Sequence, residues 1–133
     1  MARQVEVEFR GLDDAVREIR RMGQAAIDEV PGALLREGER IMARSKNEVP
    51  VDTGTLRSSG HVEGPAKRGL AAEVTLAYGG PSAQYAAVVH EKHRTASKYL
   101  ERPMRTAAAT MGRRIAADIR RALDRAARRG GGR

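Results

Sequence analysis

The chain contains no cysteine and no tryptophan, and aromatic residues are scarce, with one phenylalanine and three tyrosines among 133 residues. Without cysteine there is no disulfide framework and no zinc or iron–sulfur site held by thiolates. No apolar run reaches the roughly 18 residues that a membrane-spanning helix requires, and the first residues lack the apolar core of a signal peptide. We therefore expect a soluble protein made in the cytosol, with no membrane partner.

The length and the apolar residues indicate one domain with an aliphatic core. A chain of 133 residues can bury a core without disulfides or metal, but it has little room for a second domain. The 41% of apolar residues are mostly Ala, Val, Leu, Ile and Met, which favours a helix-rich core. We expect a single domain over residues 1–129 and a disordered glycine-rich tail at residues 130–133.

The net charge of +8 is unevenly distributed along the chain. Residues 1–97 contain 14 basic and 14 acidic residues, whereas residues 98–133 contain 11 basic and 3 acidic ones. The whole excess therefore lies near the C-terminus. Such an asymmetry favours a surface that faces nucleic acid or an acidic protein, although a basic helix that only keeps the chain soluble has the same composition.

Periodic apolar residues predict the secondary structure of the first half. Residues 5–9 alternate apolar and charged side chains, which predicts a short strand. Residues 12–48 carry apolar side chains every three or four positions, the spacing of one amphipathic helix or two. Pro31 and Gly32 predict a kink or a brief break within it. Residues 56–63 and 71–78 then predict a strand pair, and the second strand places four side chains on one face: Ala72, Val74, Leu76 and Tyr78.

The clearest helical pattern begins at Lys98 and lasts for about seven turns. Its apolar positions are Leu100, Met104, Ala108, Met111, Ile115, Ile119 and Leu123. Arginines cover much of the remaining surface. Together the elements predict an α+β domain, in which a long N-terminal helix and a long basic C-terminal helix pack on an antiparallel sheet of three or four strands.

Short motifs invite catalytic interpretations, but their surroundings argue against them. Residues 52–54 read Asp-Thr-Gly, as in aspartic proteases, yet that chemistry requires a frame of strands, and here the triplet follows a helix. His90 and His93 are three positions apart, whereas the helical zinc motif requires four, so a zinc site completed by His61 is only an alternative. We expect no enzyme activity, no metal and no cofactor.

Three segments carry a family resemblance. Residues 49–59 read VPVDTGTLRSS, residues 85–91 read YAAVVHE, and residues 99–104 read YLERPM. They resemble the small neck proteins of long-tailed bacteriophages, described as minor tail components, tail-completion proteins or head–tail joining proteins. In that family a first helix ends in V-P-V-D-T-G-x-L-R-x-S, a strand pair and Y-A-x-x-V-E follow, and a last helix begins near F/Y-L-x-P. The match departs at residues 90–93, where the family more often has an acidic residue, an aromatic and a glycine.

The resemblance implies a structural virion protein at the head–tail neck of a tailed phage, prophage or phage-like particle. It implies a tail-completion or tail-terminator ring, or a head–tail connector ring, assembled in the bacterial host cytoplasm. The implied partners are further copies of the chain, as a hexameric ring, and the neighbouring neck and tail-tube proteins. The alternative is a basic protein that binds nucleic acid without sequence preference.

Two sets of residues are candidate contact sites. The turn and loops that carry the motifs are expected to meet the ring neighbour or another partner. These residues are Val51, Asp52, Thr53, Gly54, Leu56, Arg57, Tyr85, His90, Glu91 and Tyr99. The basic helix is expected to contact packaged DNA or an acidic partner. Its candidate residues are Arg113, Arg114, Arg120, Arg121, Arg125 and Arg128.

Overall fold

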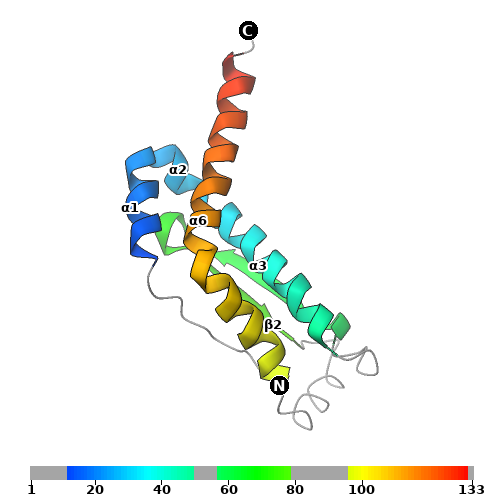
Figure 1. Cartoon of the computed structure of the whole chain (residues 1–133). Coiled ribbons are helices and arrows are strands. Elements are labelled where there is room, and N and C mark those ends of the chain that lie inside the picture. The colour runs from blue at the N-terminus through cyan, green and yellow to red at the C-terminus, as the bar shows by residue number, and fades with distance from the viewer. Residues whose placement is uncertain (1–11, 50–56, 79–95, 132–133) are drawn as a thin grey trace.

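The computed structural model describes residues 12–49, 57–78 and 96–131, which form an α+β arrangement dominated by helices (Figure 1). The helices are α1 (Asp13–Met22), α2 (Gln24–Asp28), α3 (Val30–Glu48) and α6 (Ala96–Gly131). The strands are β1 (His61–Ala66) and β2 (Glu73–Ala77), with the 3₁₀ turn η2 (Gly69–Ala71) between them. The predicted fold class is therefore confirmed, and its details differ.

The predicted long N-terminal helix is three helices, and the breaks precede Pro31. Gly23 separates α1 from α2 with a φ of 99°, a backbone conformation that residues with side chains rarely adopt. Glu29 separates α2 from α3. Pro31 is the second residue of α3, where the missing N–H removes no intrahelical hydrogen bond. The proline thus lies at the start of a helix and does not kink one.

The sheet is smaller than the sequence predicts. β1 and β2 are antiparallel, with Val62 opposite Leu76. The prediction of three or four strands is wrong for the described residues, which form this pair alone. Residues 5–9, predicted as a strand, lie outside the described ranges. β1 also begins later than residue 56, because residues 57–58 form a helical turn.

One face of the sheet packs against α3 at Gly38. A Cβ atom at this glycine would lie 3.3–3.4 Å from the side chains of Val62, Val74 and Leu76, so the helix and the sheet are in close contact. Tyr78 belongs to the same buried cluster, and Ala72 and Val74 pack against it. The face predicted for β2 is therefore confirmed.

α6 packs along α3 and continues past α1 (Figure 1). Five of the seven positions predicted from the spacing are buried, and Ala108 and Leu123 are half-buried. The buried ones are Leu100, Met104, Met111, Ile115 and Ile119. Residues 124–130 are all exposed, and this end of the helix projects beyond the other elements. We call residues 121–130 the arm. α6 includes Gly130 and Gly131, for which the sequence predicts a disordered tail.

Candidate interaction surfaces

The structure describes only part of the predicted contact set. The turn residues 51–54 and 56, together with Tyr85, His90 and Glu91, lie outside the described ranges. Arg57 lies in the helical turn before β1, and Tyr99 lies in the first turn of α6; both are half-buried. The roles of all these residues stay predictions.

Ser45 connects α3 to the beginning of α6. Its side chain is fully buried, and its hydroxyl donates a hydrogen bond to the carbonyl oxygen of Tyr99 at 2.5 Å. In an α-helix this oxygen would accept from the N–H four residues later, but that residue is Pro103, which has none. Ser45 therefore supplies a donor to a carbonyl that proline leaves without its helical partner.

Tyr78 completes a short chain of hydrogen bonds. Its hydroxyl lies 2.7 Å from Ser45 Oγ. The single hydrogen of the serine hydroxyl goes to the carbonyl oxygen, which can only accept, so Tyr78 donates to Ser45. Burial raises the pKa of Tyr78 above its ordinary value, and Glu48 raises it further, which keeps this donor protonated.

The same cluster fixes residues that border two of the motif segments. Gly60 fits between α3 and Tyr78 so closely that a Cβ would lie 2.6 Å from Tyr78 Cε1 and 2.9 Å from Met42 Sδ. Tyr78 is the last described residue before segment 79–95, and Tyr99 follows soon after that segment. The end of α3, the end of β2 and the start of α6 are therefore tied together at one place. We call this place the loop end.

The loop end and the arm lie at opposite ends of α6 (Figure 1). At about 1.5 Å per residue, the helix separates Tyr99 from the start of the arm by roughly 33 Å. The two ends of α6 therefore differ in their surroundings. One is built from Ser45, Tyr78 and Tyr99, and the other is an exposed, arginine-rich helix.

A buried carboxylate joins α3 to the middle of α6. The side chain of Glu37 is 4% exposed, and its Oε1 accepts from Nε and Nη2 of Arg114. Oε2 accepts from Arg40 Nη1 at 3.1 Å, and Arg114 also donates to the carbonyl oxygen of Ala107 at 2.9 Å. A buried charge is tolerated when it is paired and hydrogen-bonded in this way. Arg114 is therefore bound to groups of its own chain.

Two further ion pairs connect α6 to the helices beside it. Arg36 Nε on α3 donates to Asp118 at 2.8 Å. Arg120 pairs with Glu18 on α1. Of the six arginines predicted to contact a partner, Arg114 and Arg120 therefore bind carboxylates of their own chain. Arg113, Arg121, Arg125 and Arg128 are exposed.

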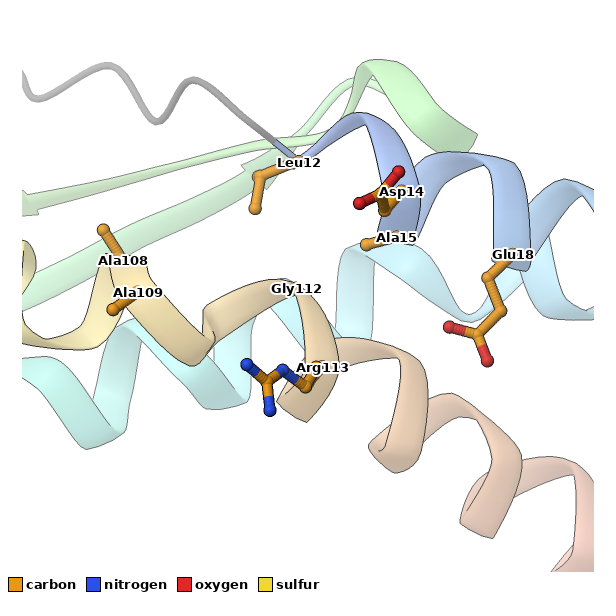
Figure 2. Close-up of a pocket in the computed structure, with 8 residues that line it drawn as sticks. All are labelled: Leu12, Asp14, Ala15, Glu18, Ala108, Ala109, Gly112 and Arg113. Atoms are coloured by element: carbon orange, nitrogen blue, oxygen red, sulfur yellow. The ribbon is translucent and has the colours of Figure 1, made fainter.

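A groove of about 240 Å³ separates α1 from α6 (Figure 2). Its lining includes three alanines and Gly112, where a Cβ would lie 3.0 Å from the Cβ of Ala15. Asp14 and Glu18 border it from α1, but Asp14 pairs with Arg17 at 2.6 Å and Glu18 pairs with Arg120. Both acidic groups are thus already paired with arginines of the same chain.

His61 at the start of β1 lies between two acceptors. Nδ1 is 2.8 Å from the carbonyl oxygen of Ser59, and Nε2 is 2.8 Å from Glu63 Oε1. Only the imidazolium can donate to both. The hydrogen bond to Ser59, followed by the one to Glu63, accordingly raises the pKa of His61 above 6.5.

Neither a metal cluster nor a membrane span is found in the parts of the chain that the structure describes. No group of three or more histidine, aspartate or glutamate side chains is placed to hold a metal ion there, while His90 and His93 lie outside those parts. Likewise, none of the described helices combines the length and apolar character needed to cross a bilayer.

Comparison with known proteins identifies no relative. No protein-family model matches the chain, and no curated protein or solved structure is significantly similar to it. The resemblance to phage neck proteins therefore rests on the three motif segments and their order.

Two of the groups that organise these surfaces were not predicted from the sequence. Ser45 and Glu37 are polar residues within an amphipathic helix, where most such residues face solvent. Helical spacing offers a partial signal, because both lie four residues from the apolar position Ile41 and so share its face. Apart from Arg40, which is three residues from Glu37, their partners lie on α6 or directly after β2, and no local pattern identifies them.

Proposed function

We propose that this protein is a structural component of the head–tail neck of a tailed phage, prophage or phage-like particle. It forms a ring of identical subunits that closes the upper end of the tail or joins the tail to the head. The ring contacts the neighbouring neck and tail-tube proteins. The role is one of contact and needs no catalysis. The ring is hexameric in the assembled particle, which matches the symmetry of a tail.

The observation that carries this proposal is the order of the motif segments. The segments at 49–59, 85–91 and 99–104 occur in the order of the neck family, with a strand pair between the first and the second. The third segment starts where the family's last helix starts, close to the beginning of α6. A single short motif would carry little weight, whereas three in a fixed order are less often coincidental.

The arrangement of the described residues supports the proposal in a second way. Subunits that meet head-to-tail around a closed axis need two different surfaces on each copy. The loop end, where Ser45, Tyr78 and Tyr99 meet, borders the motif segments, and the arm lies at the opposite end of α6. A subunit whose two ends differ suits a heterologous ring better than a two-fold dimer, because a two-fold dimer pairs one surface with itself.

Removal of the gene from a strain that produces the particle tests the function. We expect filled heads that are separate from the tails, or tails whose upper ends are irregular, because the joining ring is missing. The wild-type gene should restore joined particles. Deletion that still yields intact, infectious particles would refute the neck role.

A matched pair of variants tests the turn. Asp52→Ala with Arg57→Ala changes the predicted contact turn, whereas Asp13→Ala with Arg21→Ala removes the same charges from exposed positions on α1. The first pair should fail to restore joining and the second should restore it. If both restore it equally, the turn is not a contact surface.

A further inference from the structure

The arm carries a concentrated positive charge. Its four arginines, Arg121, Arg125, Arg128 and Arg129, stand against one acid, Asp124, which leaves a net charge of +3 over ten residues. All four arginines are exposed. Within the described chain, the ion pairs between α6 and the other helices end with Arg120 and Glu18, before the arm begins. The charge of the arm is therefore directed to solvent.

The arginines of the arm form one continuous stripe. Spacings of four and three place Arg121, Arg125 and Arg128 on one side of the helix, and Arg129 lies beside Arg125. At about 1.5 Å per residue, the stripe is roughly 12 Å long. Duplex DNA carries about one negative charge per 1.7 Å of its axis, so a length of duplex equal to the stripe carries about seven phosphate charges, part of which lie on the side that faces the helix.

The arm offers no apolar anchor to a protein partner. Apart from its charged residues it contains alanines, Gly130 and Leu123, and Leu123 packs against the core of its own subunit. Protein interfaces gain most of their affinity from large buried side chains, and exposed ion pairs contribute little to it. A polyanion needs no such anchor, because cations released from its phosphates drive binding.

We propose that the arm binds the phosphate backbone of duplex DNA, without sequence preference, through Arg121, Arg125, Arg128 and Arg129. Arg114 and Arg120 do not belong to this surface, because they bind Glu37 and Glu18 of their own chain. Duplex DNA fits better than a single strand, because the arm has no aromatic side chain on which unpaired bases stack. The arm can act in this way with or without a ring, so DNA binding and the neck role can fail separately.

The test measures the affinity of the full chain for a short duplex of random sequence over a series of salt concentrations. The arm variant replaces Arg121, Arg125 and Arg128 with glutamine. The matched control replaces Arg102, Arg105 and Arg113, three exposed arginines in the body of the same helix. Circular dichroism of both variants should match the wild type, since none of the six residues is buried.

The wild type should bind more weakly as salt rises, with the logarithm of affinity linear in the logarithm of salt concentration. Because each phosphate contact contributes about 0.9 to this slope, the arm variant should lose roughly 2.7 from it. The control should keep most of the wild-type slope. Absence of duplex binding by the wild type at low salt, or equal losses in the two variants, would overturn the proposal.

Two competitors decide between the polyanions. One competitor is single-stranded DNA of the same length as the duplex, and the other is polyglutamate with the same total charge as the duplex. Each is added to the preformed complex of the protein with the labelled duplex. We expect both to displace the duplex only at higher concentration than unlabelled duplex. Displacement by polyglutamate at equal or lower concentration would assign the arm to an acidic protein, and the same result with the single strand would overturn the preference for duplex DNA.

Discussion

Ser45 donates its hydroxyl hydrogen to the carbonyl oxygen of Tyr99, the acceptor for which Pro103 has no N–H. This relationship explains how a proline is accommodated as the eighth residue of α6, well inside the helix. It also explains why a serine is buried in α3, because the hydroxyl satisfies Tyr99 and Tyr78 together. The loop end therefore depends on one small side chain.

Replacement of Ser45 with alanine should reduce the free energy of unfolding by about 2–4 kcal/mol, because the buried Tyr78 hydroxyl and the Tyr99 carbonyl both lose a partner. Urea denaturation measures the change. Pro103→Ala restores an N–H that can bond the carbonyl oxygen of Tyr99. The free energy of unfolding lost in the double variant should therefore be smaller, by about 1 kcal/mol, than the sum of the changes in the two single variants. Strict additivity would show that Ser45 and Pro103 are not coupled.

Arg114 should matter far more to stability than its neighbour Arg113. Arg114→Ala leaves the buried Glu37 carboxylate with Arg40 alone, and we expect a loss of about 2–4 kcal/mol. Arg113→Ala removes the same charge from an exposed position and should cost less than about 0.5 kcal/mol. Thermal and urea unfolding of the two variants provide the comparison. Similar losses in both would contradict the role of the Glu37 cluster.

The stability of the protein should depend on the protonation of His61. The pKa of His61 is raised in the folded state, so its contribution is complete below about pH 6.5 and is lost as the pH rises through the folded pKa. An NMR titration of the imidazole should give a pKa above 6.5 in the wild type. Glu63→Gln should lower it, because one acceptor loses its charge. An unchanged pKa in that variant would leave Ser59 as the sole cause.

Gly60 should tolerate no side chain. Gly60→Ala places a Cβ 2.6 Å from Tyr78 Cε1, and Tyr78 cannot move away without breaking its hydrogen bond to Ser45. We therefore expect the free energy of unfolding to fall by about 1–3 kcal/mol. Gly130→Ala is the control, since nothing lies within 4 Å of that position, and alanine there should be neutral or slightly stabilising. The urea midpoints of the two variants measure both changes in stability. Equal effects would mean that the loop end is less tightly packed than described.

Helical spacing predicted the fold best where the repeat was long. The buried positions Met104, Met111, Ile115 and Ile119 follow from it, because one face of α6 is apolar over many turns. The break at Gly23 was missed, since Pro31 is the more obvious interruption, yet proline at the start of a helix disturbs nothing. Local patterns therefore located the long helix but misplaced the breaks before it.

The candidate surfaces were predictable only in outline. The charge of α6 is visible in the sequence, but its division between Arg114, which binds Glu37, and Arg125, which is exposed, depends on contacts 77 residues apart along the chain. The same holds for Ser45 and Tyr99, which are separated by 54 residues. Such pairs arise from the packing of distant elements, and no local pattern specifies them.

The mass of the purified protein, alone and after mixing with the neighbouring neck and tail-tube proteins, tests the neck proposal most directly. Light scattering measures the mass, and negative-stain imaging shows where the protein binds. We expect rings of uniform diameter, free or seated on the ends of tails, because the proposed neck role requires identical copies that meet head-to-tail around a closed axis. A protein that stays monomeric and ignores tails and neck proteins at all concentrations would contradict the account.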